Sequence, residues 1–155
     1  MGLTLQFAIG DKFKLINAAK DFDFDLLNKL ENENQLADFS LHLIPDDLNL
    51  LVNAATELKQ IPIYGLRENI DTEIYYFDLE ESGAYLVDKK IVALFSTFDD
   101  KNVLPLTEKW FEKMNIAHNE ELEVTDAAID SVQHLISISR NAMQNNADMV
   151  HIWFL

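Results

Sequence analysis

Hydrophobic and polar residues alternate along the segment LTLQFAI at residues 3–9, and a period of two is typical of a β-strand. Asp11 follows at a position that favours the capping of a short helix, because an Asp side chain accepts hydrogen bonds from a first helical turn. A second helix is predicted to begin near Asp23 or Asp25, since the leucines of residues 26–30 share one helical face. The N-terminal part of the chain therefore predicts a strand followed by two helices.

The alternation returns in residues 39–44, FSLHLI, which predict a second strand. Pro45 is tolerated in a first helical turn, and beyond it apolar residues recur every three or four positions up to Leu58, which predicts an amphipathic helix. The aromatic-rich segment EIYYFDL at residues 73–79 predicts another strand, and AYLVD at residues 84–88 predicts a short extended piece.

Residues 89–98, KKIVALFSTF, predict a helix with Asp88 as its N-cap, because their large apolar residues fall on one helical face. The same residues also admit a buried strand, so the pattern leaves both interpretations open. Pro105 and Thr107 introduce a further helix. Thr125 is predicted to cap the longest helix, whose apolar residues keep the three- and four-residue spacing of a stripe that faces a core.

The chain ends on the apolar run NADMVHIWFL at residues 146–155, which is apolar on both faces of an extended segment. This pattern is typical of a strand that is covered on two sides. We therefore predict a single layered domain of the α/β or α+β class over residues 1–155, with about four strands and about five or six helices. The C-terminal strand should lie inside the sheet.

Composition narrows the possible functions. The net charge is −15, from 27 acidic and 12 basic residues, and the chain has no cysteine. The absence of cysteine excludes disulfides, a cysteine-based zinc site and a thiol nucleophile. Because phosphate-binding surfaces need clustered Lys and Arg, we expect no binding of nucleic acid or of anionic membranes. We also expect a cytoplasmic, soluble protein, since neither a signal peptide nor a membrane-spanning run of about 20 apolar residues is visible.

Four segments of the chain carry a family resemblance. They are the MG start, FSLHLI at residues 39–44, GAYLVDKKIVALF at residues 83–95 and NNADMVHIWFL at residues 145–155. These segments resemble the YfbM-like family of uncharacterised bacterial proteins. The resemblance implies an α/β fold and no settled activity, so it assigns no catalytic residue.

Histidines and carboxylates provide the candidate chemistry. Asp130 and His134 lie four residues apart on the longest predicted helix, where a carboxylate can orient a general base or add a metal ligand. The alternative is a solvated helix face with a weak side-chain pair. His42 and His151 lie on predicted strands and could meet on one face of the sheet, although a buried histidine is more often a hydrogen-bonded structural residue. His118 falls in a predicted polar loop, where an ordinary charged loop is the alternative to a ligand set.

Common nucleotide-binding and hydrolytic motifs are absent from the sequence. The four glycines are too widely separated for a phosphate-binding loop, and no serine lies in a G-x-S-x-G elbow. We therefore predict no catalytic residue, no cofactor and no bound metal.

Two functional hypotheses follow. The first is a non-enzymatic protein-interaction module, such as an inhibitor, an immunity-type protein or an adaptor, whose acidic surface attracts a basic protein partner. Its acidity would otherwise serve solubility alone. The alternative is an enzyme or small-ligand binder that uses His42, Asp130, His134 and His151 near strand ends. Sequence leaves the oligomeric state open.

Overall fold

A computed structural model describes residues 2–67 and 75–155, which form an α+β fold with one five-stranded sheet and six α-helices in the described ranges. The strands are β1 (Thr4–Gly10), β2 (Leu36–Asp38), β3 (Tyr76–Asp78), β4 (Ser82–Leu86) and β5 (Asp148–Phe154). The helices are α1 (Lys12–Lys20), α2 (Phe24–Asn32), α3 (Pro45–Lys59), α4 (Lys89–Ser96), α5 (Val103–His118) and α6 (Asp126–Asn145), and a short 3-10 turn, η1 (Asp100–Asn102), precedes α5. The predicted fold class is confirmed, with one strand more than the approximate number expected.

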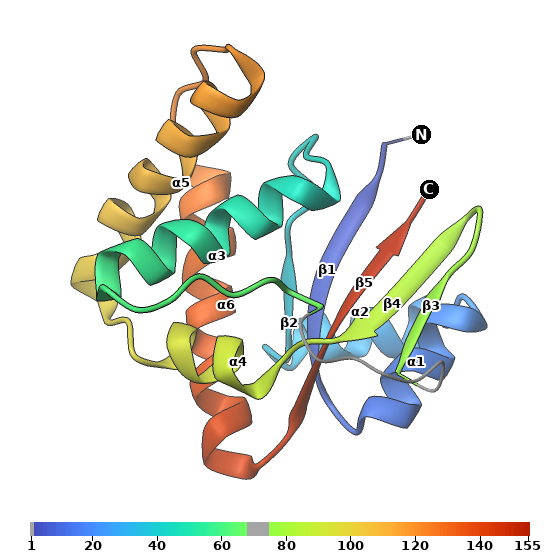
Figure 1. Cartoon of the computed structure of the whole chain (residues 1–155). Coiled ribbons are helices and arrows are strands. Elements are labelled where there is room, and N and C mark those ends of the chain that lie inside the picture. The colour runs from blue at the N-terminus through green and yellow to red at the C-terminus, as the bar shows by residue number, and fades with distance from the viewer. Residues whose placement is uncertain (1, 68–74) are drawn as a thin grey trace.

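The C-terminal strand β5 is the central strand of the sheet, whose order is β2-β1-β5-β4-β3 with every pair antiparallel (Figure 1). It pairs with β1 from Thr4↔Phe154 to Gly10↔Asp148, and with β4 from Ser82↔Phe154 to Leu86↔Val150. The prediction that this strand lies inside the sheet is therefore confirmed.

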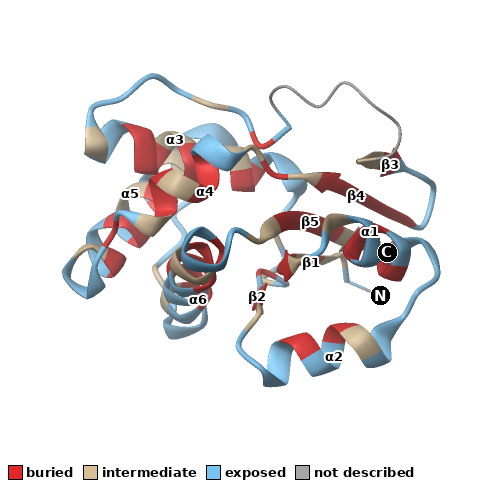
Figure 2. Ribbon diagram, turned by 90° about the horizontal axis from the view of Figure 1, so that it is seen from below, coloured by how far each residue is buried: buried red, intermediate tan, exposed pale blue. Residues whose placement is uncertain are grey.

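Helices cover both faces of the sheet (Figure 2). On one face α1 and α2 enclose the smaller core, to which β5 contributes Val150, Ile152 and Phe154. On the other face α3, α4, α5 and α6 enclose the larger core, and α6 lies against the sheet. Alternation along β5 turns His151 and Trp153 toward this larger helical layer, because successive strand residues point to opposite faces.

Local signals placed four of the helix starts correctly. The side chains of Asp11, Asp23, Asp88 and Thr125 each accept a hydrogen bond from a backbone N–H in the first turn of the following helix. These bonds satisfy donors that would otherwise lack an intrahelical acceptor. The segment that admitted either helix or strand forms α4, which settles residues 89–96 as helical.

The strand predicted for residues 39–44 is wrong. The second strand is β2, which ends at Asp38, and the carboxylate of Asp38 accepts a hydrogen bond from the backbone N–H of Ser40 at 3.0 Å. This local turn competes with extension of the ladder. His42 then adopts a φ of 61°, in the left-handed region, and its backbone breaks any extended run before α3 begins.

The strand predicted at residues 73–79 is confirmed in part as β3, while residues 73 and 74 lie outside the described ranges. None of the helices in the described part of the chain is both long and apolar enough to cross a membrane.

Candidate functional site

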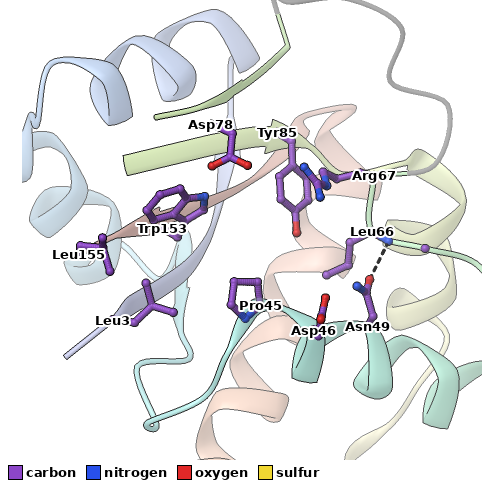
Figure 3. A pocket seen from close by; sticks show the side chains of 11 residues that line it. Leu3, Pro45, Asp46, Asn49, Leu66, Arg67, Asp78, Tyr85, Trp153 and Leu155 are labelled. Carbon is purple, nitrogen blue, oxygen red and sulfur yellow. Dashed lines mark hydrogen bonds between the residues drawn. The ribbon is translucent and has the colours of Figure 1, made fainter. Parts of the chain in front are cut away.

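A cleft of about 630 Å³ opens at the end of the sheet where β5 finishes (Figure 3). We call it the sheet-end cleft. Its lining residues are Leu3, Pro45, Asp46, Asn49, Gly65, Leu66, Arg67, Asp78, Tyr85, Trp153 and Leu155. They come from β3, β4 and β5, the residues just before β1 and just after β5, the first turns of α3 and the segment between α3 and β3, so segments far apart in the sequence build the cleft together.

The floor of the cleft follows from the register of β3, β4 and β5. Asp78 pairs with Gly83, and Gly83 pairs with Trp153, so the three residues form one row across the sheet. Cross-strand partners point to the same face. Gly83 has no side chain, and a Cβ atom there would overlap the Trp153 indole. The glycine therefore provides the space in which Trp153 lies across β4.

The opposite wall is tied to α3 by one hydrogen bond. Asn49 lies one turn into α3, and its side-chain Oδ1 accepts a hydrogen bond from the backbone N–H of Leu66 at 3.2 Å (Figure 3). Leu66 is buried against the larger core, which anchors the segment. This attachment places Arg67, the next residue, over the tyrosines of β3 and β4.

Arg67 stacks on two aromatic rings. Its Cζ atom lies 5.0 Å from the centre of the Tyr76 ring and 5.3 Å from that of Tyr85. Within the described ranges its guanidinium makes no ion pair, although Asp46 and Asp78 line the same cleft. A cation on aromatic faces keeps the donors at its edge available to a ligand.

The hydroxyl of Tyr76 donates a hydrogen bond to Oδ2 of Asp78 at 3.0 Å. Tyr76 therefore contacts the Arg67 cation with its ring and the Asp78 anion with its hydroxyl. Burial raises the pKa of Tyr85, with the positive charge of Arg67 opposing this shift and the negative charge of Asp46 adding to it. Tyr85 consequently keeps its proton and remains a neutral hydrogen-bonding group in the cleft.

His151 lies beneath the cleft and does not line it. Its ring is fully buried, 4.8 Å from the Phe7 ring and 4.9 Å from the Tyr85 ring. Neither ring nitrogen has a hydrogen-bond partner among the described residues. Burial lowers the pKa of His151 to about 3; the backbone of Gln6 opposes this shift and the charge of Arg67 adds to it. The ring is therefore neutral at pH 7.

The other histidine and carboxylate candidates lie elsewhere. His42 is exposed in the loop before α3, while Asp130 and His134 are exposed on α6 with no hydrogen bond or ion pair between them in the described structure. His42, the α6 pair and buried His151 thus occupy three separate places. Among the described residues no group of three or more His, Asp and Glu side chains could hold a metal ion.

A second groove, of about 500 Å³, contains a pair that the sequence did not indicate. His118 ends α5, and its Nε2 lies 2.6 Å from Oδ1 of the buried Asp47 carboxylate in α3. The other oxygen, Oδ2, accepts a hydrogen bond from the backbone N–H of Ile44 at 3.0 Å. The hydrogen bond and negative charge of Asp47 raise the pKa of His118. With both oxygens engaged, Asp47 joins the C-terminus of α5 to the N-terminus of α3, where each charge is favoured by its helix dipole.

Comparison with known proteins found no match among family models, curated proteins or solved structures. The resemblance to the YfbM-like family therefore stays a prediction.

Proposed function

We propose that this protein is a non-enzymatic binding protein whose sheet-end cleft receives a small ligand. The observation that carries the proposal is the presence of charged and donor groups with no committed partner in an aromatic cleft. Arg67 and Asp46 make no ion pair in the described part of the chain, and Nε1 of Trp153 makes no hydrogen bond there. The cleft volume of about 630 Å³ falls within the roughly 300–1,000 Å³ of ordinary ligand sites.

Binding fits the cleft better than catalysis does. General acid–base catalysis commonly uses histidine or a carboxyl group whose pKa is shifted toward neutrality. No histidine is among the described lining residues, and the hydroxyl of Tyr85 has a raised pKa, so it does not release its proton near neutral pH. The lining side chains instead offer fixed donors, acceptors and aromatic faces, which orient a ligand.

The two tryptophans of the chain provide a direct test. Trp153 lines the cleft, whereas Trp110 is fully buried and its Nε1 donates a hydrogen bond to the backbone oxygen of Asp47 at 2.8 Å. We would record indole N–H resonances by NMR while screening amines, carboxylates, amino acids, short peptides and nucleosides. A cleft ligand should shift the Trp153 signal, leave the Trp110 signal in place and raise the melting temperature.

A charge-matched pair of variants controls this screen. Arg67→Gln removes a positive charge from the cleft, whereas Lys29→Gln removes one from exposed α2 on the other side of the sheet. The first should weaken binding and the second should leave it unchanged. If no compound of the library moves the Trp153 signal selectively, the proposal is wrong.

The net charge of −15 favours a second candidate, the protein-interaction module with a basic partner in the cytoplasm. Attraction between an acidic surface and a basic protein accelerates association and weakens as salt rises. The expected result is a complex of fixed stoichiometry, isolated from the protein's own cells at low salt, whose association rate falls at about 0.5 M salt. Recovery of no stoichiometric complex at low salt would count against this candidate.

A further inference from the structure

The sheet-end cleft holds opposite charges apart. Tyr76 contacts Arg67 through its ring at 5.0 Å and binds Asp78 through its hydroxyl at 3.0 Å, so the cation and the anion lie on different parts of one tyrosine. They do not form an ion pair. Asp46, on the first turn of α3, adds a second carboxylate to the lining. A site with a separated cation and anion is complementary to a ligand that carries both a negative and a positive group.

From these charges we infer that the ligand is a small zwitterion with an aromatic side chain, namely an amino acid or short peptide with both termini free. This inference rests on the proposed function. The ligand carboxylate would meet the guanidinium fork of Arg67, which presents paired donors in the geometry of a carboxylate. The ligand ammonium would meet Asp78, which accepts the hydrogen bond of Tyr76, while Asp46 adds negative charge on the α3 wall of the cleft.

Aromatic side chains select the rest of the ligand. Trp153 and Tyr85 stand on neighbouring strands of the same sheet face, and the missing side chain at Gly83 leaves the indole lying across β4. Offset or edge-to-face contact between aromatic rings adds stabilisation beyond the apolar area that is buried. Leu3, Pro45 and Leu155 complete an apolar rim around these rings. A ligand ring would pack between the indole and the rim.

Other ligand classes fit the same charges less well. A phosphate or dicarboxylate would face the two carboxylates of Asp46 and Asp78. A purely cationic ligand would face Arg67, which lies on the tyrosine rings that would otherwise receive it. An uncharged apolar ligand would strip water from three charged side chains and return no hydrogen bond to them, which is costly. Only a ligand with both charges satisfies each group.

Four forms of one dipeptide test the inference. Glycyl-L-phenylalanine carries both charges, its N-acetyl form lacks the cation, its C-terminal amide lacks the anion, and the doubly blocked form lacks both. Each would be titrated into the full chain while the Trp153 indole N–H is followed by NMR, with Trp110 as the internal reference. Loss of a hydrogen bond to a charged group costs enough that each single block should weaken binding at least about tenfold.

Two conservative variants assign each charge to its residue. With Arg67→Gln the free dipeptide and its amide should bind equally weakly, and with Asp78→Asn the preference for the free dipeptide over its N-acetyl form should shrink. An unchanged Trp110 signal in both variants shows that the fold is retained, because its indole is bonded within the larger core.

The possible outcomes separate the inference from the proposed function. If the doubly blocked peptide binds as tightly as the free one, or if only ligands of another class move the Trp153 signal, the cleft is still a binding site and the zwitterion inference is wrong. If neither the dipeptides nor the wider library shift that signal, both statements are wrong.

Discussion

Buried His151 should make this fold sensitive to acid. Its ring is inaccessible, has no hydrogen-bond partner among the described residues, and packs between Phe7 and Tyr85. The positive charge of Arg67 disfavours a second cation at His151, and Tyr85, whose ring packs on it, stays neutral because its pKa is raised. We therefore expect the folded protein to exclude the proton that the unfolded chain binds at this histidine.

The size of the effect follows from the shifted pKa. Burial lowers the pKa of His151 from the ordinary 6.5 to about 3. Below pH 6.5 the unfolded state therefore binds more protons than the folded state, and stability falls as the pH falls. Between pH 7.5 and pH 5 the loss is about 2 kcal/mol, and below pH 3 it approaches about 5 kcal/mol. Against a total stability of about 5–15 kcal/mol, the smaller figure is readily measured.

Two substitutions isolate this contribution. His151→Leu removes both polarity and titration, whereas His151→Gln removes titration and keeps a polar side chain. Urea unfolding at several pH values gives the difference in unfolding free energy between each variant and the wild type. As the pH falls from 7.5 to 5, the unfolding free energy of each variant should rise by about 2 kcal/mol relative to that of the wild type. At pH 7.5, His151→Leu should also be more stable by about 1–3 kcal/mol, because two unpaired buried nitrogens are gone.

Other ionisable groups cancel in this comparison, since the variants share them with the wild type. His118 is one such group, and its pH dependence has the opposite sign because its pKa is raised. If the differences do not change with pH, the ring of His151 has the same proton affinity in both states, and its description as an unpaired buried base is wrong.

Three further predictions concern the strand end, the cleft floor and the second groove. Deleting residues 152–155 should unfold the domain, because burial of each large apolar side chain contributes about 1.5–3 kcal/mol to stability. Circular dichroism would follow the loss of structure, and a truncated chain that melts like the full one would refute this prediction. Gly83→Ala should lower the free energy of unfolding, measured by chemical denaturation, by about 1–3 kcal/mol, because the added Cβ would overlap the Trp153 indole. Gly65→Ala is the control and should be nearly neutral, because its Cβ meets open space. Equal effects of the two substitutions would contradict the overlap. His118→Gln should lower the melting temperature more at pH 5.5 than at pH 9. Because the pKa of His118 is raised in the folded state, its ion pair with Asp47 stabilises the fold below the pKa of the unfolded chain, and this stability is lost as the pH rises through the folded-state pKa. An equal decrease in melting temperature at both pH values would show that no ion pair forms with Asp47.

The fold was predictable where the signals were local. Asp11, Asp88 and Thr125 each bind the first turn of the helix that follows them, and this interaction depends on residues two or three positions away. The C-terminal strand was predictable because a segment that is apolar on both faces needs cover on both sides. The alternation of apolar and polar residues gave a wrong strand prediction at residues 39–44. There the side chain of Asp38 accepts a hydrogen bond from the backbone N–H of Ser40, and this local turn takes the place of a longer strand ladder.

The cleft was not predictable, because its residues meet through strand register. In the sequence Trp153 is one of several apolar residues in a run, and nothing adjacent to it indicates the space that Gly83 leaves on the neighbouring strand. Arg67 is one of only two arginines and shortly precedes an aromatic strand, which was the one available signal. Its contacts with Tyr76 and Tyr85 require both the β3–β4 pairing and the bond between Asn49 and Leu66.

The last strand connects the stability of the fold to the candidate site. Ile152 and Phe154 point into the smaller core and hold the sheet together, while His151 and Trp153 point to the opposite face, one beneath the cleft and the other in its lining. Because period-two alternation separates these roles, a substitution at Ile152 should change stability with little direct effect on the cleft, whereas one at Trp153 changes the lining of the cleft directly. His151 lies between the two functions, since its burial depends on the same tyrosine that lines the cleft. A ligand that binds the folded cleft and not the unfolded chain stabilises the folded state, so it should lower the pH at which the protein unfolds.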